Sequence, residues 1–158
     1  IYVYRYAYNV LSEELWPKLD FSCPDLFLRI KQATIAKMKV FYKYPAIFDF
    51  FINVAADQAN SEIQTALQKE ISGQKKDAYD KLMSDIDYGD IKDEFDKNQV
   101  VCVILWTIDG FGNMISEQIK DRTLEPEDFS AWMADFDKYI ETLKKAFCKE
   151  EYINGVRD

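Results

Sequence analysis

The sequence predicts an all-α fold, and three observations lead to that prediction. Apolar residues recur at the three- and four-residue spacing of helices over several long stretches. Only five glycines and four prolines punctuate the chain, too few for the many tight turns of an all-β domain. The composition is 48% hydrophobic and 30% charged, which is apolar enough to fold and too interrupted for a membrane span of about 20 residues. We therefore expect about six helices and no sheet.

The first expected helix runs from Tyr2 to Trp16. The stretch from Tyr2 to Tyr8 alternates as a strand would and is rich in β-formers. The apolar residues that follow have helical spacing, and Pro17 ends the element. We interpret the whole stretch as one helix.

Three helices are expected over 25–42, 46–54 and 61–83. The first has two possible capping residues, Ser22 and Asp25, and a continuous apolar stripe. The second follows Pro45 and is apolar on nearly all sides, as a short buried helix would be. The third is more polar and has Gly73 at its middle, which costs about 1 kcal/mol relative to Ala and could bend the helix.

An acidic segment over 85–98 predicts a loop that divides the chain into two halves. Beyond it, an apolar run predicts a buried helix over 99–120. A start signal at Leu124 to Glu127 then precedes the most regular amphipathic stripe in the sequence, which continues to Phe147. Residues 150–158 have little to bury and are expected to fray.

The chain has no histidine, which removes Ser-His and Cys-His nucleophile pairs and most zinc sites. Its carboxylates are expected on solvated helix faces or in the acidic loop. That loop resembles a calcium site in composition only, because an EF-hand needs Gly at its sixth position and Glu at its twelfth, where counting from Asp85 gives Asp90 and Asp96. We expect no catalytic residue, no metal and no cofactor.

Net charge and cysteine content limit the possible partners and the cellular compartment. The net charge is −8, the wrong sign for a surface that neutralises phosphates, so this chain is not expected to bind DNA by itself. Its three cysteines form no CxxC pair and favour a reduced, cytoplasmic protein. No secretory signal is expected, and the start at Ile1 without Met is typical of a fragment boundary.

Two binding surfaces follow from the residue pattern. Aromatic and methionine side chains on several helices could line an apolar cavity, although the same residues would also be expected in ordinary core packing. The last two helices are more apolar than one core requires. Their outer faces are therefore expected to meet a second copy in a four-helix bundle.

Four motifs in order resemble the regulatory domain of TetR/AcrR-type repressors: Leu19-Asp20-Phe21, Pro24-Asp25-Leu26-Phe27, Lys43-Tyr44-Pro45-Ala46-Ile47-Phe48-Asp49-Phe50 and Leu105-Trp106-Thr107-Ile108-Asp109-Gly110-Phe111. The resemblance covers nearly the whole chain. It implies that residues 1–16 connect to a helix-turn-helix head before Ile1, which would bind operator DNA. It also implies a ligand-binding and dimerisation domain over 17–150 and a tail over 151–158.

The resemblance implies an effector pocket and a homodimer. The expected pocket residues are Phe27, Ile30, Met38, Phe48, Phe51, Ile52, Tyr79, Met83, Trp106 and Asp109. The expected dimer residues are Ile104, Ile108, Phe111, Ile115, Trp132, Phe136, Tyr139, Ile140 and Leu143. A small hydrophobic or cationic aromatic effector would suit such a lining, where a buried carboxylate is costly unless it caps, pairs or meets a cation. Effector binding would shift the dimer to a state that releases the operator.

Two other hypotheses remain open. A helical interaction module would use the same apolar stripes to hold a different protein, without any ligand cavity. A helical enzyme is the third, for which the sequence supplies no histidine and no coherent set of carboxylates.

Overall fold

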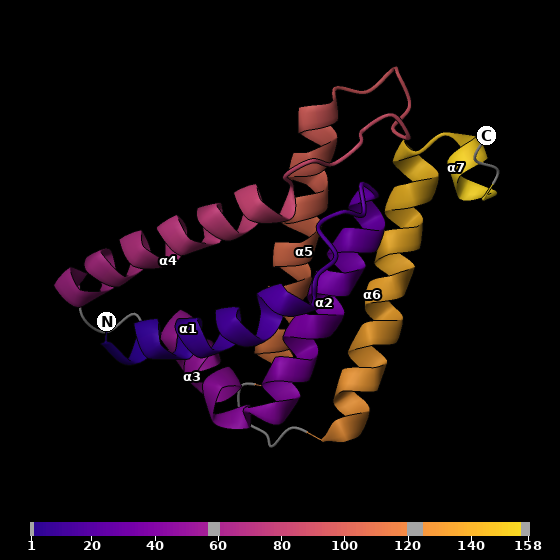
Figure 1. The fold of residues 1–158 in the computed structure, drawn as a ribbon. Coiled ribbons are helices and arrows are strands. Elements are labelled where there is room, and N and C mark those ends of the chain that lie inside the picture. Colours follow the sequence, from indigo (N-terminus) through magenta and orange to yellow (C-terminus); the bar gives the residue numbers. More distant parts are fainter. Residues whose placement is uncertain (1, 57–60, 120–124, 156–158) are drawn as a thin grey trace. The chain divides into compact units, whose positions relative to one another are not determined.

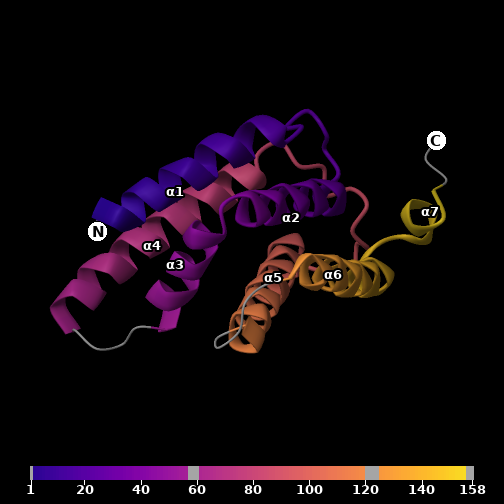
Figure 2. The ribbon, with the colours of Figure 1, turned by 90° about the horizontal axis from the view of Figure 1, so that it is seen from below.

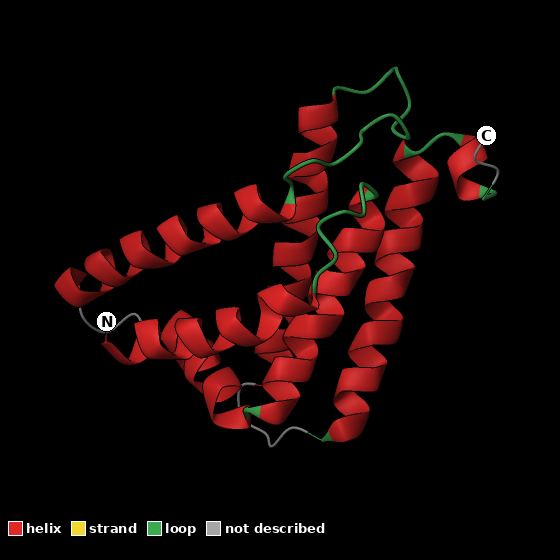
Figure 3. Ribbon diagram, viewed as in Figure 1, coloured by secondary structure: helices red, strands yellow, loops and turns green. Residues whose placement is uncertain are grey.

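The computed structural model describes residues 2–56, 61–119 and 125–155, and this part of the chain is all-helical, with no strand (Figure 3). The prediction of an all-α fold is confirmed. The elements are α1 (Tyr2–Leu15), the 3-10 helix η1 (Trp16–Lys18), α2 (Leu26–Lys43), α3 (Pro45–Ala56), α4 (Ser61–Leu82), α5 (Lys97–Ile119), α6 (Pro126–Phe147) and α7 (Glu150–Ile153). The α-helices are labelled in Figure 1.

The chain divides into two compact units, residues 1–86 and 87–158. The division lies in the acidic segment that the sequence predicted to separate two halves. Asp85, near the end of the first unit, has a positive φ of 55°. This is a left-handed conformation that Asp tolerates better than most side chains.

The core of the first unit lies where α1, α2 and α3 meet. Tyr4 and Ala7 of α1 are buried, as are Val40 and Phe41 of α2 and Phe48 of α3. Of the two expected capping residues, Asp25 caps α2, because its carboxylate accepts a hydrogen bond from the Leu28 amide.

A carboxylate ties the end of α1 to the end of α2. Glu14 accepts hydrogen bonds from Lys43 at 2.6 Å, from the Tyr44 hydroxyl at 2.9 Å and from Lys18 at 3.2 Å. The bonds from Lys43, Tyr44 and Lys18 lower the pKa of Glu14 to about 2, and the bond to Glu14 raises the pKa of Lys43 to about 12.

Helix α4 runs alongside α1 in the same direction (Figures 1 and 2). It continues through Gly73 without a break, although the sequence allowed a bend there. Whereas α1 packs its backbone closely against α2 and α3, its contacts with α4 run through long side chains. Of the apolar stripe of α4, Leu82 is buried, but Ile71, Ala78 and Tyr79 are only half-buried.

In the second unit, α5 and α6 pack as an antiparallel pair. Phe111 of α5 meets Phe136 and Tyr139 of α6, with ring centroids 5.4 and 5.7 Å apart. Further along, the Trp132 indole donates to Gln118 Oε1 at 3.2 Å. Helix α6 begins with a capping box formed by Glu125 and Asp128.

The acidic segment before α5 forms hydrogen bonds with the C-terminal end of α6. Ile91 forms an isolated antiparallel bridge with Cys148. Lys92 donates from its backbone to Phe147 O and from its ammonium to Ala146 O, each at 2.9 Å. These bonds satisfy last-turn carbonyls that α6 cannot pair internally.

Two elements differ from the sequence prediction. The expected first helix ends one residue early and tightens into η1, because Pro17 removes an amide donor. The expected frayed tail includes the short helix α7, whose Ile153 and Asn154 amides donate to Lys149 O and Glu150 O.

Candidate functional site

An aromatic cluster occupies the inside of the first unit. Tyr4 stacks near Tyr8 at 6.5 Å and meets the edge of Phe51 at 5.7 Å. Phe41 adds contacts to Phe51 at 6.2 Å and to Phe48 at 4.7 Å. The cluster thus joins α1, α2 and α3, and its Tyr4–Tyr8 side belongs to the helix that runs beside α4.

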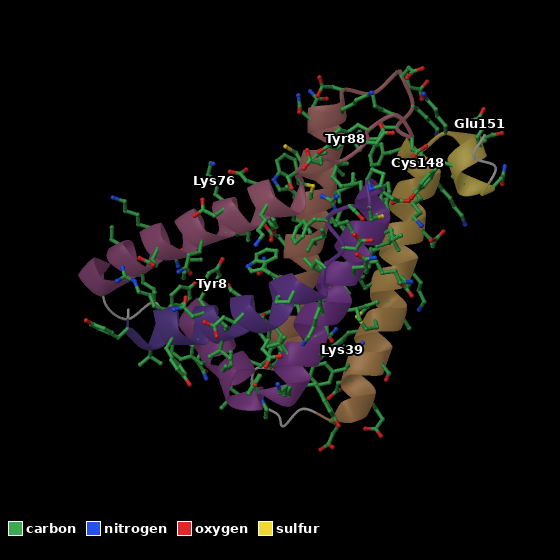
Figure 4. All side chains as sticks on the ribbon, in the orientation of Figure 1. Tyr8, Lys39, Lys76, Tyr88, Cys148 and Glu151 are labelled. Carbon is green, nitrogen blue, oxygen red and sulfur yellow. The ribbon has the colours of Figure 1, made fainter. Side chains whose placement is uncertain are left out.

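Polar side chains connect this side of the cluster to α4. The Arg5 guanidinium binds Glu70 in a two-pronged ion pair, with bonds of 3.1 and 2.9 Å. The hydroxyl of Tyr8, the α1 residue labelled in Figure 4, donates to Gln74 O at 3.3 Å. The Gln74 amide nitrogen in turn donates to Glu70 at 3.2 Å. We call Tyr4, Tyr8, Glu70 and Gln74 the α1–α4 site.

The site contains a buried acceptor without a donor. Gln74 Oε1 is inaccessible to solvent and accepts no hydrogen bond from any residue that the structure describes. The direction of the amide is fixed by its nitrogen, which already donates to the Glu70 carboxylate. A buried acceptor left unpaired costs about 1 to 3 kcal/mol, so it requires an explanation such as a bound molecule or water.

The electrostatics of the site keep its phenol neutral and its carboxylate ionised. Burial, followed by smaller electrostatic contributions from Tyr8 and Glu70, raises the pKa of Tyr4 to about 12. The hydrogen bond from Arg5 lowers the pKa of Glu70, and the same contact raises the pKa of Arg5. At neutral pH the site therefore offers aromatic surface, an amide acceptor and a carboxylate that one arginine neutralises.

These groups suit binding better than catalysis. Aromatic faces take up planar rings, an amide oxygen accepts an N–H or O–H, and a carboxylate beside tyrosine rings favours a cation. Within the described ranges, no three His, Cys, Asp or Glu side chains are grouped so that they could hold a metal ion.

Arg29, on α2, is the one charged residue among the buried side chains of the described chain. Its guanidinium donates to Cys23 O, Phe21 O at 2.8 Å, Leu82 O at 3.2 Å and Ser84 O. All five N–H groups of the side chain are thereby used. Arg29 has no donor left for a ligand, and it ties the loop before α2 to the end of α4.

The expected pocket residues are distributed over both units, with Trp106 and Asp109 in the second and the others in the first. Phe27, Ile30 and Phe48 are buried, and Met38, Phe51, Tyr79, Met83 and Asp109 are half-buried. Trp106 is 71% exposed, and the side chain of Ile52 lies outside the described residues. Phe48 and Phe51 do belong to the aromatic cluster. None of the four residues of the α1–α4 site was among the expected pocket residues, and Glu70 and Gln74 carry no signal in the apolar periodicity.

Most of the expected dimer residues are instead buried within the single chain. These are Ile104, Phe111, Ile115, Trp132, Phe136, Ile140 and Leu143, while Ile108 is half-buried and Tyr139 is 44% exposed. The stripe of α6 is covered in part by α5 of the same chain. The side chains that α5 leaves exposed are others, with Cys102 and Trp106 among them.

One segment of α5, Lys97–Gln118, is long and apolar enough to cross a membrane by length and composition alone. We had expected charged residues to interrupt every apolar stretch before it reached the length of a membrane span, and this expectation was too strict for α5. Only 22% of this segment is buried, but it packs against α6, which carries charged residues along most of its length. One apolar helix of this kind is weak support for a membrane segment.

Comparisons with known proteins add no assignment. No protein-family model matches the chain, and neither curated proteins nor solved structures give a significant match. The comparisons therefore do not identify it as a TetR-type protein.

Proposed function

We propose that this chain is the effector-binding body of a TetR-type repressor and that the effector binds at the α1–α4 site. The order of the helices and the motifs quoted above support the family. The unpaired Gln74 Oε1, beside two tyrosine rings and a carboxylate, is the observation that carries the binding site.

The effector would be a planar aromatic molecule that bears an N–H or O–H donor. Its ring would lie against Tyr4 and Tyr8, and its donor would reach Gln74 Oε1. Because α4 meets α1 through side chains, a ligand can enter by displacing those contacts without separating closely packed backbones.

The contacts that a ligand would displace suggest how binding could be transmitted. Arg5 and Tyr8 hold the first half of α1 to α4. A ligand that takes over Glu70 and Gln74 would release this half of α1, which the resemblance places next to the DNA-binding head. A ligand with higher affinity for the released conformation would shift the population toward it.

Two probes of equal shape test the site: indole, which has an N–H donor, and benzothiophene, which has none. The wild-type protein should bind indole about tenfold more tightly, as one hydrogen bond to a buried acceptor is worth about 1.4 kcal/mol. Gln74→Leu should abolish the preference. Gln68→Leu, at an exposed position of the same helix, is the matched control and should retain it.

Equal affinities for both probes in the wild-type protein, or no saturable binding of either, would contradict the proposal. The second candidate function, an interaction module without a ligand site, would then be preferred. Its specific support is the exposure of Trp106, 71% accessible on α5.

A further inference from the structure

The segment before α2 and the last turn of α4 bring two aromatic rings and a lysine ammonium together within the first unit. Trp16, the first residue of η1, and Phe21, in the loop that follows, have ring centroids 6.2 Å apart and ring planes tilted by 40°. The Lys81 ammonium nitrogen lies 4.6 Å from the centroid of the Trp16 ring and 5.5 Å from that of Phe21. We call the two rings the aromatic corner.

The contact of Lys81 with this corner is not a consequence of helix spacing. Lys37 lies over Phe41 and Lys75 lies over Tyr79, and each of these rings is four residues further along the same helix, where side chains meet by geometry alone. Lys81 instead lies over two rings from a distant part of the sequence. The fold therefore builds a position at which an ammonium group contacts two aromatic side chains.

The backbone on both sides of the corner is held in place. The Arg29 guanidinium donates to Phe21 O at 2.8 Å and to Leu82 O, at the end of α4, at 3.2 Å. In the segment before α2, the Leu19 amide donates to Trp16 O at 3.2 Å. A site whose walls are already ordered loses little conformational entropy when a ligand binds.

Lys81 is a weak occupant of the corner. It is solvent-exposed, and a lysine side chain gives up much rotamer freedom when it stays in one position. Its ammonium is strongly hydrated through three N–H groups. A trimethylammonium group has no N–H to hydrate and presents methyl groups to both rings, so it should gain more from the same position.

The charges around the corner favour a cation once Lys81 has moved away. Asp20, next to Phe21, accepts hydrogen bonds from the Ser22 hydroxyl and amide at 2.5 and 2.9 Å, and these bonds lower the pKa of its carboxyl group. The nearby guanidinium of Arg29 is surrounded by carbonyl oxygens that offset its charge. An incoming cation therefore meets two aromatic rings beside an ionised carboxylate.

We infer that the aromatic corner is a second binding site, for a trimethylammonium group, and that Lys81 is its built-in competitor. The ligand takes the place of the Lys81 ammonium at the rings of Trp16 and Phe21, and the lysine side chain moves into solvent. The inference does not depend on the proposed function. None of its residues belongs to the α1–α4 site, and a trimethylammonium group has no donor for Gln74 Oε1.

The trimethylammonium group can come from a free small molecule or from the headgroup of phosphatidylcholine. Sedimentation with phosphatidylcholine vesicles distinguishes the two sources. Protein that sediments with the vesicles and is released by choline would identify the lipid headgroup. Protein that binds choline but does not sediment with the vesicles would identify a free ligand.

Choline and 3,3-dimethylbutan-1-ol test the site itself, because they have the same shape and only choline is charged. The titration is followed by nuclear magnetic resonance of the Trp16 indole N–H at constant ionic strength, which removes general salt effects. Choline should shift this signal saturably, and the neutral alcohol should not. Equal responses to both compounds, or no saturable shift with choline, would overturn the inference.

Two lysine variants test the role of the competitor. Lys81→Met should tighten choline binding by about threefold or more, because the ligand no longer competes with a tethered ammonium. Lys76→Met is the matched control: it removes the same charge from a side chain of α4 that is 74% exposed and lies about 140° from Lys81 around an ideal helix.

The control should leave the affinity for choline unchanged. Both variants change exposed side chains, so misfolding is not expected to obscure the comparison, and the melting temperature of each variant checks this. Equal affinities of wild type, Lys76→Met and Lys81→Met for choline would show that Lys81 does not compete for the corner and would overturn the inference.

Discussion

Replacing Arg29 by methionine should destabilise the first unit by about 3 kcal/mol. Methionine fills similar space but provides no donor, so the carbonyls of Phe21, Cys23, Leu82 and Ser84 lose their bonds. The bond to Leu82 O is buried, and that acceptor should incur the full cost of about 1 to 3 kcal/mol.

The other three carbonyls are only partly buried and can recover part of the loss from water. Removing the guanidinium also removes its own desolvation cost, which offsets some of the penalty. Arg29→Lys should lose less than Arg29→Met, because an ammonium can keep some of the bonds but cannot span all four carbonyls.

Hydrogen exchange measured by mass spectrometry can localise the effect. Peptides covering 20–30 and 78–86 should exchange faster in Arg29→Met, while peptides of α6 should change little. Arg5→Met is the control, since Arg5 forms an ion pair on a side chain that is 57% exposed, where solvent leaves such a pair little net contribution to stability. A free energy of unfolding within about 0.5 kcal/mol of wild type for Arg29→Met would refute the reasoning.

Two further predictions concern the first unit. The pKa of Glu14 is lowered to about 2 from an ordinary 4.5, so its contribution to stability is present above pH 4.5 and is lost as the pH falls toward 2. Glu14→Gln should therefore flatten this part of the pH profile of the free energy of unfolding. Glu13→Gln, one residue away and exposed, should not. Gly73→Ala should stabilise α4 by about 1 kcal/mol, since Gly73 lies mid-helix with open space around it; a lower melting temperature would show that α4 needs flexibility there.

The helices could be predicted because their signals are local. Pro17, the cap at Asp25 and the stripe from Phe129 to Phe147 each determine an element from neighbouring residues. The start of α6 was also predicted, although its capping box became clear only from the geometry of Glu125 and Asp128. Helix α7 was missed because a helix of four residues leaves no periodicity to detect.

The partners of each apolar stripe could not be predicted in the same way. Periodicity indicates that Phe111 and Phe136 are covered, but not whether the cover is another chain or the neighbouring helix. The structure packs these two rings against each other, so each covers the other within one chain. Trp106 shows the reverse, since it lies in an apolar run and yet is 71% exposed.

The sequence predicted part of the neighbouring aromatic cluster but none of the four residues of the α1–α4 site. Phe48 and Phe51 stood out as apolar residues, and the structure places both in the aromatic cluster. Glu70 and Gln74 look like ordinary solvated residues of a polar helix. Their role depends on Arg5 and Tyr8, more than sixty residues away in the chain, and a contact of that range has no local signature.

The most direct test of the proposed binding site is a titration of isotope-labelled protein with indole, followed by nuclear magnetic resonance. The site predicts that the Gln74 side-chain amide and the backbone amides of residues 4–8 and 70–74 shift together and saturably. Benzothiophene at the same concentration should leave the Gln74 side-chain signal in place. Saturable shifts confined to other residues, or no saturable shift with indole, would contradict the site and with it the proposed function.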